Sequence, residues 1–293
     1  MRVTSRMMVE DSIQYMNDSL ERLSQLQTRV ASGKMIQTPA DDPTVAVAGL
    51  SLRSTLQSNQ AYIDTGYVVR DWLTATELAL KEAVDLGRNA QTLASAGVSD
   101  TFSADERLAL ADDIDAMLQH LTGVGNSVHK GKYLFAGFKV TTEPFTYTGA
   151  GVTNNLASTA DQMQLSIAPG QTLTINTDGN AVFTPLFGAL TNVRDALRAN
   201  DRTALEPALS TLATAVEGAI AARTTNGARQ RQLDTEMDRL DQLKTALKSL
   251  LSNKEDANLA ESISMLKQQE TVYQAVLQAG ARAVTPTLFD FLR

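Results

Sequence analysis

Both ends of the chain carry apolar residues in alternating steps of four and three, and this spacing limits what the chain can fold into. The first stripe comprises Val9, Ile13, Met16, Leu20, Leu23 and Val30, with Gln27 in the one polar slot. The second comprises Leu259, Ile263, Leu266, Tyr273, Leu277 and Val284, interrupted by Glu270 and Gly280. This is the a/d repeat of a coiled coil, in which one narrow face of a helix packs against another helix. Such stripes can pack inside one chain, against other copies, or both.

Long helices are expected between the two ends. One helix should run from Pro43 to about Ala96, a rod of roughly 80 Å at about 1.5 Å per residue. Another should begin after Ser103-Ala104-Asp105-Glu106, a capping box in which Ser103 is the N-cap and Glu106 reaches back to it. Helices resume after Pro185, and a further one starts near Asn200-Asp201.

The period changes between residues 140 and 183. Residues 145–148, 164–167 and 172–175 alternate polar and apolar side chains, as half-buried strands do, and Gly- or Pro-containing turns separate them. We therefore predict a mainly α protein, with a long coiled-coil-like helical bundle formed by both chain ends and a small β-rich inserted domain. The expected domains are 1–42 plus 257–293 as terminal helices, 43–139 plus 184–256 as a bundle, and 140–183 as an outer insert.

Two adjacent carboxylates, Asp41 and Asp42, raise the question of a catalytic or metal site. Asp42 precedes Pro43, and Asp at the N-cap followed by Pro at the first helical position is a common helix start. A metal site would need partner ligands, and the only histidines, His120 and His129, lie on different faces of an ideal helix. We therefore assign Asp42 and Ser103 as helix caps, and expect no catalytic, cofactor-binding or metal site.

Composition narrows the class of protein further. The net charge is −7 without a Lys/Arg cluster, which argues against nucleic-acid binding. Cysteine is absent, which removes disulfides and thiolate chemistry. No apolar run approaches the ~18 residues of a membrane span, and the first residues lack the apolar core of a signal peptide. We expect a protein without membrane contact or a cleaved signal.

Several short motifs together resemble the flagellin superfamily. Residues 31–36, Ala-Ser-Gly-Lys-Met-Ile, followed by Pro-Ala-Asp-Asp-Pro at 39–43, are similar to the signature near the N-terminus of that family. The start Met-Arg-Val-Thr and the segment Tyr133–Gly137 followed by Pro144-Phe145 resemble its hook–filament junction branch. The C-terminal region, 257–263, 273–277 and 288–292, is also similar. One departure is Gln37-Thr38, where the family often has Asn-Ser.

The resemblance implies a structural role in the bacterial flagellum. The terminal helices would line the inner tube, and their stripes, with Leu288, Phe289 and Leu292, would form the assembly interface. The implied partners are the first junction protein, flagellin, copies of the chain in a ring, and an export chaperone at the C-terminal segment. Export would follow the flagellar type III route to the hook–filament junction outside the cell. The terminal helices are expected to be disordered in the monomer, because neither has a sizeable core of its own.

Three other readings remain. Flagellin itself shares both ends, although the short β insert and residues 133–137 favour the junction branch. A cytosolic coiled-coil adaptor would also show heptads, but would need neither the insert nor paired terminal stripes. An enzyme is disfavoured because no polar residues converge in a recognisable motif.

Overall fold

Six helices and three two-stranded sheets form the described part of the chain. The structure, a computed structural model, describes the backbone of residues 5–290 and the side chains of residues 7 and 10–281. The helices are α1 (Ser5–Ser32), α2 (Pro43–Val98), α3 (Ala104–Gly125), α4 (Gly179–Arg198), α5 (Arg202–Glu255) and α6 (Leu259–Asp290). The chain divides into two compact units, residues 1–58 with 244–293 and residues 59–243. The predicted mainly α fold with a small β-rich insert is confirmed, while the predicted three-part division stays a prediction.

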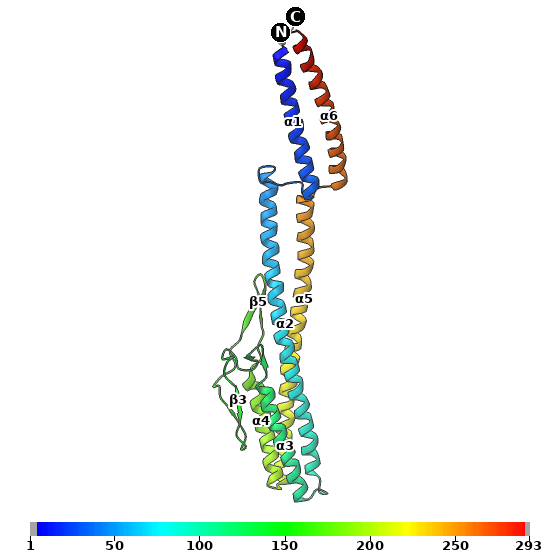
Figure 1. The fold of residues 1–293 in the computed structure, drawn as a ribbon. Helices are drawn as coiled ribbons and strands as arrows, with labels where there is room; N and C mark the ends of the chain where they lie inside the picture. Colours follow the sequence, from blue (N-terminus) through cyan, green and yellow to red (C-terminus); the bar gives the residue numbers. More distant parts are fainter. Residues whose placement is uncertain (1–4, 291–293) are drawn as a thin grey trace. The chain divides into compact units, whose positions relative to one another are not determined.

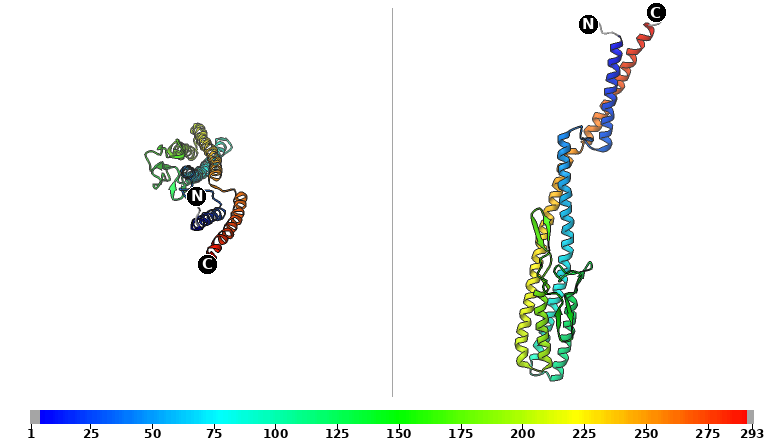
Figure 2. Two further views of the ribbon diagram at one scale, coloured as in Figure 1. Left: turned by 90° about the horizontal axis from the view of Figure 1, so that it is seen from above. Right: turned by 90° about the vertical axis from the view of Figure 1, so that its left-hand side faces the viewer.

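The unit of residues 59–243 is a helical bundle with the β-rich insert on it. In Figures 1 and 2, α2 and α5 run side by side, and α3 and α4 lie along them. Asn59 and Asn226 are buried, and their side-chain amides donate to the carbonyls of Leu240 and Leu73 across the α2–α5 contact. Fully buried leucines and isoleucines fill the centre, among them Leu73, Leu80, Ile114, Leu118, Leu121, Leu186 and Leu190.

The ends of α3 and α4 show how local sequence sets helix boundaries. At α3 the Ser103 hydroxyl accepts from the Glu106 amide, and the Glu106 carboxylate accepts from the Ser103 amide. The expectation that helix resumes only after Pro185 is wrong, because α4 begins at Gly179 and contains Pro185. The reason is Asp178, whose carboxylate accepts from the amides of Asn180 and Ala181 and so acts as the N-cap rather than as a turn residue.

The insert consists of antiparallel hairpins. β3 (Phe145–Tyr147) pairs with β4 (Val152–Asn154), and β5 (Gln164–Ala168) pairs with β6 (Gln171–Thr174), with an irregular register between Ser166 and Ala168. A third pair, β1 (Val128–His129) with β2 (Lys132–Tyr133), has no alternating pattern in the sequence because each strand has two residues.

The insert shares its core with the helices. Phe145 is fully buried, and its ring lies 5.7 Å from that of Phe183 and 5.1 Å from that of Phe187, both on α4. Ile167 and Leu173, on β5 and β6, belong to the same buried cluster as the helix side chains. The hairpins therefore contribute to the core of the bundle as well as to its surface.

A buried arginine fastens the β3–β4 hairpin to the helices. Arg194 of α4, 3% exposed, donates to Asp115 of α3 at 2.8 Å and to the carbonyls of Gly149 and Ala150 in the hairpin turn. The Tyr147 hydroxyl donates to the same carboxylate at 2.5 Å. Burial raises the pKa of the Asp115 carboxyl, but the hydrogen bonds from Tyr147 and Arg194 and the attraction of the cations together bring it below its ordinary value.

We predict that Asp115→Asn lowers the free energy of unfolding at pH 7 by about 1–3 kcal/mol, because Arg194 loses one of its two charged partners, Asp195 being the other. A lowered native pKa gives stability that is present above the unfolded pKa of about 3.9 and is lost as pH falls through the native pKa. The gap between parent and variant should therefore narrow in denaturant titrations as the pH falls from about 7 to about 2. Asp112→Asn, which removes an exposed partner of Arg198, serves as control. An equal gap at both pH values would contradict this role.

Candidate assembly interface

The terminal helices α1 and α6 lie side by side in antiparallel orientation (Figures 1 and 2). The Ala257 amide donates to the Gly33 carbonyl where one helix ends and the other begins, and further along Gln269 contacts Ser19. Apart from Arg29 near the end of α1, the buried or half-buried positions are Ser12, Met16, Ser19, Leu23, Leu26 and Val30 on α1, and Ser262, Leu266, Gln269, Tyr273, Val276 and Gly280 on α6. We call these the inward rows, and both keep the four-three spacing.

The inward rows coincide only in part with the predicted stripes. Met16, Leu23, Val30, Leu266 and Tyr273 lie in both. Four predicted residues instead lie outside, where Ile13 and Leu20 are each 48% exposed, Ile263 is 42% exposed and Leu277 is 40% exposed. We call these four the outer row. Leu259 is likewise 49% exposed, at the start of α6.

Some predicted positions cannot be placed by their side chains. The described residues do not include the side chains of Val9, Val284, Leu288 and Phe289, or any part of Leu292. The assignment of all these positions to an assembly interface stays a prediction. Sequence reasoning missed Ser19, Ser262 and Gln269, because polar residues give no signal in an apolar pattern.

The loop between α1 and α2 explains the paired carboxylates. Asp42 Oδ1 accepts from the amides of Thr44 and Val45, at the start of α2. Asp41 Oδ2 accepts instead from the amides of Gln37 and Thr38, and these bonds hold the pKa of Asp41 below its ordinary value. One carboxylate thus closes the loop, and the next begins the helix.

An ion-pair cluster joins this loop to the end of α5. Arg53 donates to the Glu255 carboxylate at 2.6 Å, and Lys34 lies 2.5 Å from Asp256 and 3.6 Å from Glu255. The hydrogen bond between Lys34 and Asp256 raises the pKa of the lysine and lowers that of the carboxyl. The Glu255 side chain is only 9% exposed, and a Cβ at Gly49 would lie 2.4 Å from its Oε1. Glycine in the first turns of α2 therefore lets this carboxylate approach the helix.

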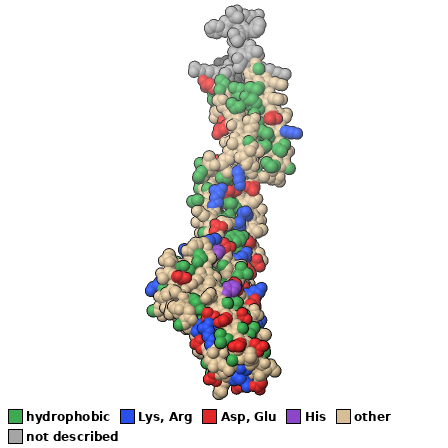
Figure 3. Space-filling model, turned by 60° about the horizontal axis from the view of Figure 1, so that its bottom comes forward, with side chains coloured by type: hydrophobic (Ala, Val, Ile, Leu, Met, Phe, Trp, Pro, Cys, Tyr) green, Lys and Arg blue, Asp and Glu red, His purple; other side chains and the backbone are tan. Residues whose placement is uncertain are grey.

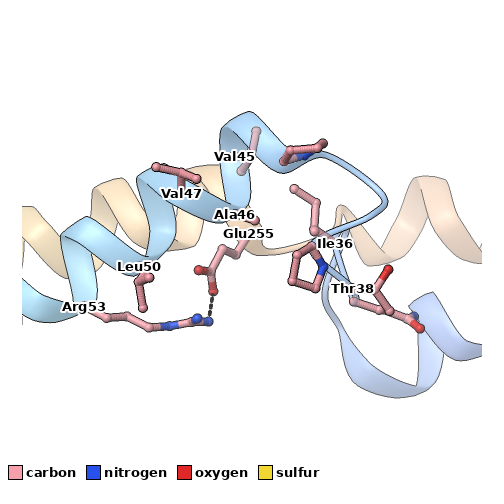
Figure 4. Close-up of a pocket in the computed structure, with 11 residues that line it drawn as sticks. Ile36, Thr38, Val45, Ala46, Val47, Leu50, Arg53 and Glu255 are labelled. Atoms are coloured by element: carbon pink, nitrogen blue, oxygen red, sulfur yellow. Dashed lines mark hydrogen bonds and ion pairs between the residues drawn. The ribbon is translucent and has the colours of Figure 1, made fainter.

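A groove of about 380 Å³ lies over this cluster. Figure 4 shows Ile36, Val45, Val47 and Leu50 around it, with the Arg53–Glu255 pair at one side. Val47 and Leu50 are 69% and 68% exposed. Most of the large hydrophobic side chains that are exposed among the described residues belong to the unit of residues 1–58 with 244–293, and Figure 3 shows hydrophobic side chains on the surface of the molecule. Exposed apolar side chains around a groove are a common feature of protein–protein interaction sites.

Other classes of site find no support in the described ranges. No cluster of three or more His, Asp or Glu that could hold a metal ion occurs in them. None of the helices, as far as they are described, has the length and apolar character needed to span a membrane.

Residues 3–140 match the family profile of the bacterial flagellin N-terminal helical region. The chain is 24% identical to flagellar hook-associated protein 3 of Salmonella typhimurium over 221 residues, or 74% of this chain and 68% of that protein. It is 25% identical to the protein of the same name of Escherichia coli over 255 residues, or 86% and 76%. The chain is similar to flagellar hook-associated protein 3.

The fold agrees with this similarity. The crystal structure of hook-associated protein 3 from Legionella pneumophila superposes with a TM-score of 0.63 at 13% identity, covering 69% of this chain and 97% of that one. The segment Tyr133–Gly137, one of the motifs that resemble the junction branch, has a physical reason here. Leu134 and Phe135 are buried, and Gly137 has a φ of +60°, with a Cβ position 3.2 Å from the Thr159 backbone. Only glycine fits such a position without strain.

We predict that Asp42→Ala lowers the free energy of unfolding by about 0.5–2 kcal/mol, because the amides of Thr44 and Val45 lose their acceptor. Hydrogen exchange should localise the loss to the first turn of α2. Thr38→Ala, in the same loop but with its backbone amide retained, is the control. Unchanged exchange at the amides of residues 44–46 in the Asp42 variant would rule out the capping role.

We also predict that limited proteolysis of the dilute free chain cuts first within residues 1–42 and 257–293. A pair of helices with a single narrow seam buries little apolar surface, so it should open more readily than the bundle. Mass spectrometry of the fragments identifies the cut sites. First cuts within residues 59–243 would contradict the expected order of stability.

Proposed function

We propose that the chain is a structural subunit of the bacterial flagellum that joins the hook to the flagellin filament. The observation that carries the proposal is the unpartnered outer row of the terminal helix pair, in a chain similar to hook-associated protein 3 along most of its length. Apolar side chains that one chain leaves exposed on long helices can be covered by the helices of neighbouring subunits.

The proposed partners follow from a position between two different assemblies, the hook and the filament. Copies of the chain form a ring that contacts the first junction protein on one side and flagellin on the other. Before assembly, an export chaperone covers the C-terminal segment, and the chain leaves the cell by the flagellar type III route without a cleaved signal. Its role is mechanical, with no catalysis, cofactor or nucleic acid involved.

A deletion strain provides the test. We expect electron microscopy to show hooks without filaments, with unassembled flagellin in the medium, and the intact gene to restore filaments. A filament subunit would behave differently, because its loss removes flagellin from the medium. Filaments that persist in the deletion strain would refute the proposal.

Complementation with variants tests the interface. Ile13→Ser with Leu20→Ser should be secreted but fail to restore filaments, because the outer row loses two of its apolar side chains. Gln14→Ser with Asn17→Ser, exposed polar positions on the same helix, should restore them. Melting of the bundle should be the same in both variants. Full restoration by the Ile13/Leu20 variant would remove the outer row from the interface.

A further inference from the structure

The contact between α1 and α6 contains a matched polar pair. Gln269 Nε2 donates to Ser19 Oγ at 3.0 Å and to the Ser19 carbonyl at 3.2 Å. Ser19 is only 6% exposed, and it lies between the apolar inward positions Met16 and Leu23. Its hydroxyl is therefore shielded from water, and Gln269 donates to it across the contact.

The Ser19–Gln269 contact also sets the levels at which the two helices meet. Because the helices are antiparallel, residue numbers rise along α1 towards the joint and fall along α6 towards it. Leu23 therefore lies at the level of Leu266, and Leu26 at the level of Ser262. The Ala257–Gly33 hydrogen bond at the joint agrees with this register.

A second seam is available to the same two helices. Turning each helix by about one residue position would bring the outer row inward and keep Met16, Leu23, Leu266 and Tyr273 at the contact. That seam would place Glu270 at the level of Leu20 and Gln27 at the level of Ile263. A carboxylate or amide packed against an aliphatic side chain without a partner is strongly unfavourable. In the observed seam, polar Ser19 meets polar Gln269 instead.

We infer that the Ser19–Gln269 hydrogen bond is a specificity determinant of the terminal helix pair. It selects the seam on which α1 and α6 join, and so keeps Ile13, Leu20, Ile263 and Leu277 facing outward for a second copy of the chain. A buried polar pair that fixes register at some cost in stability is an established device in coiled coils. The identity of the partner rests on the proposed function, whereas the choice of seam does not.

Cysteine cross-linking in the full chain tests the choice of seam, since the chain has no cysteine of its own. The pair Leu26→Cys/Ser262→Cys reports the observed seam, and the pair Gln27→Cys/Ile263→Cys reports the alternative. The first pair should cross-link in far higher yield. Adding Gln269→Ala should lower the ratio of the two yields about two- to tenfold, the equivalent of one hydrogen bond. Gln268→Ala, the exposed neighbour, should leave the ratio unchanged, and Ser19→Thr, which keeps the hydroxyl, should preserve it.

Two results would overturn the inference. One is an unchanged ratio in the Gln269→Ala variant. The other is an equal fall of both yields, which would mean that the hydrogen bond only stabilises the pair. The outcome is separable from that of the proposed function. A changed ratio together with filaments that persist in the deletion strain would keep the seam selection and reject the junction role.

Discussion

A pair of helices has one seam, and the terminal helices of this chain have more apolar surface than one seam can cover. Leu23 is buried at 9% exposure, while Leu20, one turn away on the neighbouring face, remains 48% exposed. Full burial of a leucine or isoleucine is worth about 1.5–3 kcal/mol, and the outer-row side chains, which are 40–48% exposed, forgo part of that. The single chain therefore leaves apolar surface exposed, which neighbouring helices would cover in the proposed assembly. The rest of this unit, which comprises residues 33–58 and 244–258, connects the two helices at one end.

The joint at the base of the pair contributes through directed bonds rather than apolar burial. Glu255 is almost completely removed from water, and its charge is acceptable only because Arg53 and Lys34 lie close by. Those two residues come from α2 and from the loop after α1, so the carboxylate ties three segments of the chain to one point. Gly49 makes room for it. The conspicuous pair Asp41 and Asp42 has a simpler task, since each satisfies two backbone amides within its own loop or helix start.

Features set by local sequence could be predicted, and features set by distant partners could not. The caps of α2 and α3 depend on neighbours within three residues, so Asp42 and Ser103 were recognisable from spacing alone. Asp178 has the same chemistry, but its neighbours in the sequence also fit a turn between strands. The sequence therefore predicts a later start for α4 than the observed Gly179. Glu255 gave no signal, because its partner Arg53 is 202 residues away. Hydrophobic spacing likewise showed which residues of α1 and α6 can be buried, but not which of two overlapping rows the single chain buries.

Polar residues decide which of these two rows the single chain buries. A search for apolar periodicity takes no account of them, and it therefore selects the outer row. Ile13 and Leu20 give the stronger hydrophobic pattern, yet turning them inward would bring Glu270 against Leu20. Ser12 and Ser19 give a weaker pattern, yet they allow Ser19 to meet Gln269. A chain that assembles gains from this arrangement, because pairing the weaker row internally leaves the stronger row for its neighbours.

The bundle of residues 59–243 shows the opposite distribution. There Asn59, Asn226 and Arg194 donate hydrogen bonds to other residues of the unit, and large apolar side chains fill its centre. We propose that the unit of the terminal helices, in contrast, is completed by association with further copies.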